Sequence, residues 1–260
     1  MISLNNVSIS FGELQVLSDV TAHFPTGETT AILGQSGAGK SVILKLLVGL
    51  LKADSGEVSV LGTDLGSASE EELYTLRRRL GMLFQNAALF DSLTVAENVA
   101  FPLEQQRPRP DSKEIADRVA EALQSVGLEG FQDRQVSDLS GGQRKRVGLA
   151  RAIITRPEIL LFDEPNSGLD PITSEAIDAL ICTMKRELGI TFVVITHDIV
   201  GALKVADHLC MLHDGRIVEH APIQQFLQSE HPVVRGFLNR NVSIDAQGGI
   251  RPPTIEEIRG

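Results

Sequence analysis

The stretch TTAILGQSGAGKSVILKLL, residues 29–47, decides the fold. It opens with an apolar run typical of a buried strand, crosses a loop with three glycines and continues as a helical pattern from Lys40. The loop, GQSGAGKS, fits the pattern G-x-x-x-x-G-K-[ST]. Its glycines let the backbone N–H groups face inward, and the following helix adds its positive N-terminal end. The alternative is an accidental glycine-rich turn, but the flanking strand and helix favour a phosphate-binding loop.

The side chains of this loop also suit a nucleotide and its metal ion. Lys40 supplies a point charge to the outer phosphates, and the Ser41 hydroxyl can bind Mg²⁺. The residues predicted to bind nucleotide in this loop are Gly34, Gln35, Ser36, Gly37, Ala38, Gly39, Lys40 and Ser41. A site of this kind predicts a bound nucleotide and leaves the protein's function open.

Composition limits the classes of protein that remain. The 260 residues are 42% hydrophobic and 22% charged, which are ordinary globular values. No apolar run reaches the ~18 residues needed to cross a bilayer, and the N-terminus lacks the pattern of a signal peptide, so we expect a cytosolic chain. The net charge of −10 argues against nucleic acid as a partner. Cys182 and Cys210 have no partner motif and are interpreted as reduced thiols.

Strand and helix patterns alternate along the chain, which predicts an α/β fold with a mainly parallel sheet. The early strand-rich region predicts an added antiparallel β layer, and residues 86–155 are interpreted as an inserted helical subdomain. A hairpin is expected to turn at Asp214 and Gly215. The predicted strands are 2–10, 14–24, 28–33, 57–62, 80–84, 158–164 and 190–196, and the predicted helices are 40–51, 70–79, 111–127, 141–153, 173–188 and 199–206.

Two carboxylates follow the apolar run EILLF, which reads as a central buried strand. They would lie at the carboxyl end of that strand, where open α/β sheets bind ligands. Asp163 can orient Mg²⁺, and Glu164 can accept a proton from an attacking water. His197 ends another apolar strand and is expected at the same sheet edge, as a contact to the γ-phosphate. An exposed acidic strand end and a structural histidine are the alternatives.

The sequence LSGGQRKRVGLARAI, residues 139–153, predicts a second anion site at a helix N-terminus. Its binding residues would be Ser140, Gly141, Gly142 and Gln143. One ATP in one chain does not need two such loops. The simplest interpretation is that each loop serves a different nucleotide across a dimer.

Because it combines LSGGQ with a phosphate-binding loop, the chain resembles the ATP-binding subunits of ABC transporters over about residues 2–228. GQSGAGKS, Gln85, LSGGQ, ILLFDE, SGLD and His197 appear in that family's order. The resemblance implies a head-to-tail homodimer that holds two ATP with Mg²⁺, bound in part by Ser41, Gln85 and Asp163. It also implies that Gln85 contacts Mg²⁺ or the lytic water. Phe11 and Val16 would contact adenine, and Asp170 would cross the dimer interface.

The stretch FQNAALFDSLTVAENVAFPL, residues 84–103, is apolar for a chain that is only 4% aromatic. By the same resemblance this region forms a groove that receives a short helix of a membrane permease. Ala88, Leu89 and Phe90 are the residues expected at the groove. Ordinary core packing of Leu89, Phe90, Val99 and Phe101 is the alternative, and we expect part of the stretch to serve each purpose.

Among ABC ATPases, residues 85–103 and 163–174 are most similar to the ATPases of MCE-type lipid transport, which include the Mla systems. HPVVRGFLNR, residues 231–240, resembles the end of those subunits. This resemblance implies phospholipid or related hydrophobic cargo, a permease, an MCE-domain protein and a small cytosolic regulator at the inner membrane's cytoplasmic face. The ATPase domain would span residues 1–240, and residues 241–260 would form a tail that contacts a neighbouring subunit or stays disordered.

Three other classes compete with this interpretation. An ABC importer of amino acids or other small solutes uses nearly the same cassette. ABC-type ATPases of DNA repair or translation usually add coiled coils, zinc modules or a second cassette, which this chain lacks. A P-loop kinase does not account for LSGGQ.

Overall fold

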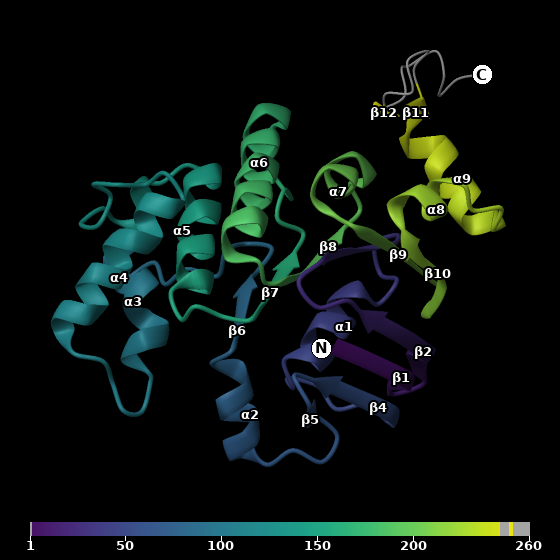
Figure 1. The fold of residues 1–260 in the computed structure, drawn as a ribbon, viewed down its shortest axis with the longest axis horizontal. Coiled ribbons are helices and arrows are strands. Elements are labelled where there is room, and N and C mark those ends of the chain that lie inside the picture. The colour runs from purple at the N-terminus through teal and green to yellow at the C-terminus, as the bar shows by residue number, and fades with distance from the viewer. Residues whose placement is uncertain (1, 245–249, 252–260) are drawn as a thin grey trace. The chain divides into compact units, whose positions relative to one another are not determined.

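The computed structural model describes residues 2–244 and 250–251, which fall into two compact units (Figure 1). The first unit comprises Met1–Leu73 and Val193–Gly260, as far as they are described, and the second comprises Tyr74–Phe192. Helix α2 (Glu70–Arg77) leads the chain from the first unit into the second, and strand β8 (Thr191–Thr196) leads it back. Each unit is described by itself.

The first unit contains an antiparallel sheet in the order β2-β1-β4-β5. Its strands are β1 (Ile2–Phe11), β2 (Leu14–Phe24), β4 (Ser55–Val60) and β5 (Thr63–Asp64). Leu4 lies opposite Ala22 on one side and Val58 on the other, and all three side chains are buried. This sheet confirms the antiparallel layer that the strand-rich N-terminal sequence predicts.

A second set of strands in the first unit carries the glycine loop. Strand β3 (Thr29–Leu33) is buried throughout and pairs in parallel with β9 (His208–His213). Strand β9 turns back into β10 (Arg216–Pro222) as an antiparallel hairpin. Asp214 and Gly215 both have positive φ, as a two-residue hairpin turn of the primed type requires. The predicted hairpin is confirmed.

The helices of the first unit are α1 (Lys40–Leu47), α7 (Ile199–Val205), α8 (Ile223–Leu227) and α9 (Pro232–Asn241). Helix α1 ends four residues before the predicted boundary at Leu51. Gly49 takes a φ of 67° there and donates its N–H to the Leu46 carbonyl at 2.9 Å, which closes the helix in the manner of a C-terminal glycine cap.

In the second unit, β6 (Leu80–Leu83) pairs in parallel with β7 (Ile159–Asp163). Around them are α3 (Val95–Glu104), α4 (Ser112–Ser125), a 3₁₀ turn (Val136–Asp138), α5 (Gly141–Ile153) and α6 (Pro171–Leu188). The predicted α/β class, with parallel strands and an antiparallel layer, is confirmed. The helical subdomain predicted over residues 86–155 falls within this unit and stays a prediction.

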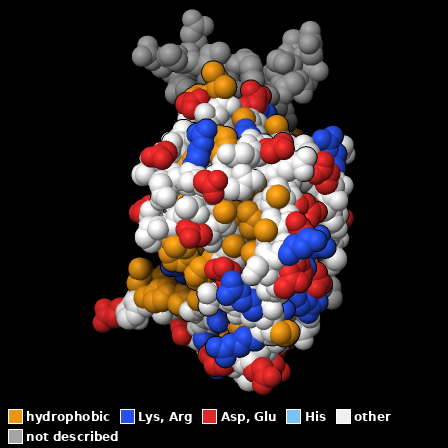
Figure 2. Space-filling view, turned by 90° about the vertical axis from the view of Figure 1, so that its left-hand side faces the viewer, with side chains coloured by type: hydrophobic (Ala, Val, Ile, Leu, Met, Phe, Trp, Pro, Cys, Tyr) orange, Lys and Arg blue, Asp and Glu red, His pale blue; other side chains and the backbone are white. Residues whose placement is uncertain are grey.

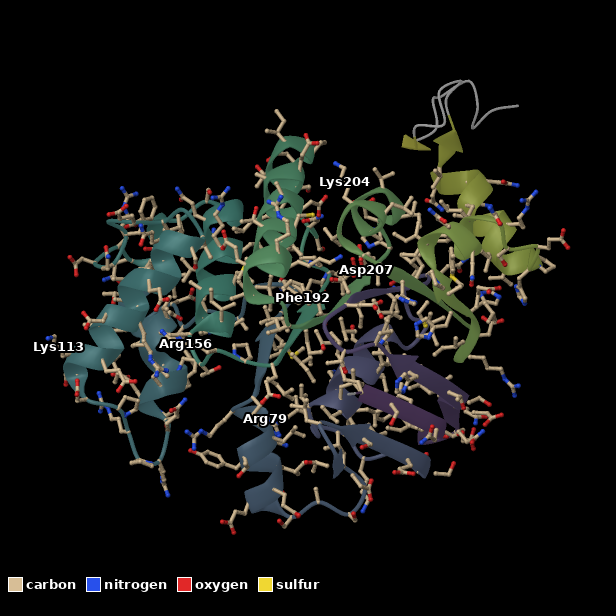
Figure 3. The ribbon with its side chains drawn as sticks, viewed as in Figure 1. Arg79, Lys113, Arg156, Phe192, Lys204 and Asp207 are labelled. Atoms are coloured by element: carbon tan, nitrogen blue, oxygen red, sulfur yellow. The ribbon has the colours of Figure 1, made fainter. Side chains whose placement is uncertain are left out.

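Close packing fixes α5 against β6. A Cβ on Gly81 of β6 would come within 2.2 Å of the Ala152 carbonyl oxygen, so only glycine permits this approach. Arg79, labelled in Figure 3, forms an ion pair of 2.6 Å with Glu158 just before the two parallel strands begin. Phe192, also labelled, packs on Phe162 with ring centroids 5.4 Å apart. These contacts pack α5 on β6 and tie the starts of β6 and β7 together.

The chain beyond α9 is described only in part. Two short strands, β11 (Ser243–Ile244) and β12 (Ile250–Arg251), pair antiparallel. Most of the predicted tail, at residues 245–249 and 252–260, lies outside the described residues. No helix among the described residues is long and apolar enough to cross a bilayer.

Candidate functional site

The glycine loop after β3 is too tight for any other residue at two of its positions. A Cβ on Gly34 would lie 2.5 Å from the Leu212 carbonyl oxygen. A Cβ on Gly39 would lie 2.8 Å from Leu17 Cδ2, and Gly39 also has a φ of 102°, which L-residues disfavour. At these two positions the loop therefore packs directly on the neighbouring strands β9 and β2.

Lys40 lies inside the glycine loop. Its side chain is buried, and its Nζ donates to the carbonyl oxygens of Gly34 at 2.7 Å and Gln35 at 3.1 Å. An ammonium held at the centre of a ring of backbone groups and at the start of α1 is placed to meet a phosphate. The predicted phosphate-binding residues thus form one continuous cradle.

The candidate adenine contacts lie on the hairpin of β1 and β2. Phe11 ends β1 with 48% of its surface exposed, so its ring face is available for stacking. Val16 is on β2, and its carbonyl oxygen would be 3.1 Å from a Cβ on Gly39. Strand β2 therefore runs directly beside the phosphate loop.

His197 follows β8 and is exposed. It lines a cavity of about 530 Å³ together with Gly34, Gln35 and Ser36. The predicted neighbourhood of His197 and the phosphate loop is therefore present within the first unit. Helix α9 supplies another wall of the cavity, with Phe237 and Arg240 among its lining residues. Sequence reasoning missed this helix.

The second unit places the two carboxylates at the carboxyl end of β7. Ile159 to Phe162 are buried, whereas Asp163 and Glu164 are partly exposed. Glu164 has a φ of 48°, a left-handed conformation that non-glycine residues adopt at a cost of about 1–3 kcal/mol and that is concentrated at functional sites.

Gln85 lies at the same edge, because β6 and β7 are parallel neighbours and Gln85 comes two residues after β6 ends. Its Nε2 donates to Ser167 Oγ at 3.0 Å, and Ser167 follows the carboxylates by three residues. The structure therefore brings the predicted glutamine and the predicted carboxylates together.

The LSGGQ segment forms a capped helix start. Ser140 accepts a hydrogen bond from the Gln143 N–H at 3.3 Å, and the Gln143 side chain accepts from the Ser140 N–H at 2.9 Å. Gly142 packs against α6, where a Cβ would lie 2.5 Å from Thr173 Cγ2. Ser140 and Gly141 are exposed, so this helix end can meet a ligand from outside the chain.

Asp170 caps the start of α6. Its carboxylate accepts from the N–H groups of Ile172 at 3.1 Å and Thr173 at 3.0 Å, and from the Thr173 hydroxyl at 2.5 Å. The hydroxyl bond and the Thr173 N–H bond lower the pKa of this exposed carboxyl. Ile172, the next residue but one on α6, is 83% exposed.

A groove of about 560 Å³ lies over the stretch of residues 84–103. Ala88 and Phe90 line it as predicted, but Leu89 does not. We call this surface the Phe90 groove, and it is lined by Tyr74, Arg77, Arg78, Leu80, Gly81, Met82, Phe84, Ala88, Phe90, Phe101, Pro102, Gln106, Arg151, Ala152 and Thr155. Figure 2 shows the side of the chain with α3 and α4, where hydrophobic side chains gather in patches between charged ones.

Leu89 is not among the residues that line the groove. Ala87 and Ala88, just before it, both have positive φ, 57° and 47°, which is an uncommon conformation for non-glycine residues. Asn98, fully buried, then fixes the next turn: its amide accepts from the Phe90 N–H at 2.8 Å and donates to the Phe90 carbonyl at 3.0 Å. Val99 is buried, so the stretch contributes to the core as well as to the lining of the groove.

Oxygen donors of the three predicted kinds suit magnesium. Ser41 offers a hydroxyl, Gln85 an amide oxygen and Asp163 a carboxylate, and Mg²⁺ typically takes a few such ligands together with phosphates and water. Among residues 2–244 and 250–251, no group of three or more His, Cys, Asp or Glu could hold a metal by itself.

These features define a phosphate-loop nucleoside triphosphatase: a strand is followed by a glycine loop around a lysine and then by a helix, and two carboxylates lie at the end of another strand. Residues 17–167 match the ABC transporter family, and the chain belongs to that family. It is the ATPase subunit of an ABC transporter and works with ATP and Mg²⁺.

Several relatives are similar to nearly the whole chain. A probable ribonucleotide transport ATP-binding protein, mkl of Mycobacterium leprae, is 42% identical over 92% of this chain and 68% of its own length. The methionine import ATP-binding protein MetN of Cereibacter sphaeroides is 43% identical over 92% of this chain and 69% of its own length. The intermembrane phospholipid transport ATP-binding protein MlaF of Escherichia coli is 38% identical over 92% of this chain and 88% of its own length.

A solved structure supports the fold. The ATP-binding cassette MJ0796, a dimer in a post-hydrolysis state with ADP and Pi, superposes with a TM-score of 0.78. It is 35% identical, and the match covers 86% of this chain and 99% of that one. The predicted ABC ATPase fold is confirmed.

Proposed function

We propose that this ATPase powers transport of phospholipid or related hydrophobic cargo at an inner membrane, in a system of the MCE or Mla type. The observation that carries the proposal is the resemblance of residues 85–103 and 163–174 to that group, joined by the match to MlaF over 88% of its length. The similarity to MetN supports a second candidate, import of an amino acid or another small solute.

The nucleotide contacts follow from each residue's chemistry. We assign the phosphates to the loop of residues 34–41, adenine to Phe11 and Val16, and the γ-phosphate to His197. The exposed Phe11 ring and the position of His197 beside the loop support these assignments. The resident Mg²⁺ would neutralise developing phosphate charge, and Ser41, Gln85 and Asp163 would hold it.

Glu164 is assigned as the base that accepts the proton of the attacking water, and Gln85 as the residue that orients this water. The placement of both at one sheet edge and the left-handed backbone of Glu164 support this assignment.

We further infer that two copies of the chain form an ATP-dependent homodimer. Ser140, Gly141, Gly142 and Gln143 of one copy would bind the ATP of the other, and Asp170 would lie at the interface. The exposed, capped start of α5 and the dimeric cassette with ADP and Pi support this inference. ATP would favour the closed dimer, and hydrolysis would release it.

The Phe90 groove is assigned to a membrane permease. An exposed Phe90 beside Phe101, with ring centroids 4.7 Å apart, gives the groove an apolar floor, the kind of surface that the apolar face of a helix binds. The chain would then act as a peripheral subunit on the cytoplasmic face of the inner membrane. An MCE-domain protein and a small cytosolic regulator would complete the system. The tail at residues 241–260 would contact a neighbouring subunit.

Co-purification tests the cargo and the groove together. We expect the tagged chain, extracted gently from its membranes, to carry a permease, an MCE-domain protein and phospholipid, identified by mass spectrometry. Phe90→Asp should lose all three, because an aspartate cannot be buried in an apolar interface without a partner. Leu50→Asp, at an exposed leucine of the first unit, should keep them.

Two outcomes would contradict this proposal at different points. A soluble-solute receptor with a different permease, and no phospholipid, would replace lipid cargo by the second candidate. Normal co-purification of a folded Phe90→Asp variant would remove the groove from permease docking.

A further inference from the structure

A lysine of α5 touches the backbone of both residues assigned to the attacking water. The Nζ of Lys145 donates hydrogen bonds to the carbonyl oxygen of Gln85 and, at 3.2 Å, to that of Glu164. Only 5% of Lys145 is exposed. These contacts join segments 60 and 19 residues away along the chain.

Burying an ammonium group costs desolvation free energy that an apolar group does not. Burial lowers the pKa of Lys145, although the nearby carboxylates of Asp163 and Glu164 oppose the shift. An apolar side chain of similar length would avoid this desolvation cost. The ammonium offsets this cost through its attraction to the two carboxylates and through its two hydrogen bonds, which end on the carbonyls of Gln85 and Glu164.

Helix α5 connects this contact to two other surfaces. It begins with the capping box of Ser140, five residues before Lys145. Near its other end, Arg151 donates to the carbonyl oxygens of Ala87 at 2.5 Å and Ala88 at 2.7 Å. One helix thus holds the LSGGQ end, the catalytic edge and the floor of the Phe90 groove.

We propose that Lys145 is a positioning residue that fixes the backbone of Gln85 and Glu164 to the helix carrying LSGGQ. When the LSGGQ end of α5 binds the ATP of the partner subunit, α5 moves. Lys145 then moves the backbone of Gln85 and Glu164, the residues that act on the chain's own ATP. The two sites of a dimer then hydrolyse cooperatively. This inference rests on the homodimer of the proposed function.

The test compares Lys145→Met, which keeps the length and removes the hydrogen bonds, with Lys145→Arg, which keeps donors. We expect Lys145→Met to bind ATP as the native chain does, while kcat falls about 10- to 100-fold, as small misplacements of catalytic groups cause. The Hill coefficient for ATP should fall toward one. Lys145→Arg should recover a part of both quantities.

Lys113→Met is the matched control. Lys113 lies at the outer edge of α4, exposed, as Figure 3 shows. Its loss should leave kcat, ATP affinity and the Hill coefficient unchanged. Thermal unfolding of all variants separates lost positioning from lost folding.

Three results would overturn the proposal. Native kcat in a folded Lys145→Met chain would show that the two carbonyls need no anchor. A parallel loss of ATP affinity, kcat and thermal stability, with no recovery in Lys145→Arg, would show a packing role only. A fall in kcat with an unchanged Hill coefficient above one would remove the link between sites. A native Hill coefficient of one would instead contradict the homodimer of the proposed function, and the kcat comparison would still decide whether Lys145 positions Glu164.

Discussion

Glu164→Gln should bind ATP with nearly native affinity and hydrolyse it at least about 100-fold more slowly, the scale that a general base contributes. The amide keeps the size and the hydrogen-bonding shape of the side chain but cannot take a proton from water. The backbone of residue 164, held in its left-handed conformation, gives the new side chain the same position. Nucleotide titration and steady-state phosphate release measure the two quantities.

Glu158→Gln provides a matched control at the other end of the same strand segment. Glu158 forms an exposed ion pair with Arg79, whose loss costs about 1 kcal/mol or less. The rate of ATP hydrolysis by Glu158→Gln should therefore equal that of the native chain. Rapid hydrolysis by Glu164→Gln would remove Glu164 from the role of base.

Gly39→Ala should abolish useful ATP binding. The residue has a φ of 102°, and its Cβ would lie 2.8 Å from Leu17 Cδ2 and 3.1 Å from the Val16 carbonyl oxygen. The loop would have to open, which misaligns its N–H groups and Lys40. Left-handed strain alone costs about 1–2 kcal/mol, or roughly tenfold, and the steric overlap adds to it. We therefore expect a loss of about 100-fold or more in ATP affinity.

Gly37→Ala separates the two causes. Gly37 also has a positive φ, 81°, but a Cβ there would meet nothing within 4 Å. Its ATP affinity should fall about tenfold or less, because only the backbone strain remains. Equal affinities for the two variants, measured by titration with unfolding temperatures alongside, would contradict the steric explanation.

The local parts of the fold were predictable from sequence. The strand, glycine loop and helix around Lys40 follow from periodicity and one motif, and the hairpin at Asp214 follows from its turn residues. Asp111 caps α4 as the sequence indicates, with its carboxylate accepting from the Glu114 N–H at 2.8 Å. Each of these features depends on residues close together in the chain.

The contacts that α5 makes with the backbone of Gln85, Glu164, Ala87 and Ala88 were not predictable. Lys145 and Arg151 sit in an ordinary helical pattern, and only folding brings them to carbonyls 60 and 64 residues earlier. Leu89 was assigned to the groove because it is apolar, but apolar character alone does not decide which side chains line a groove after two residues with positive φ. Helix α9 carries a signal, a capping His231 before Pro232, in a segment too short to decide by periodicity.

ATP should join two of these chains through their phosphate and LSGGQ loops. Light scattering of purified Glu164→Gln measures this association, since the variant should retain ATP without hydrolysing it. We expect the mass of one chain without nucleotide and of two chains with ATP, and the mass of one chain with ATP when Ser140→Arg is added. A single-chain mass for Glu164→Gln at saturating ATP, with nucleotide bound, would exclude the ATP-dependent dimer.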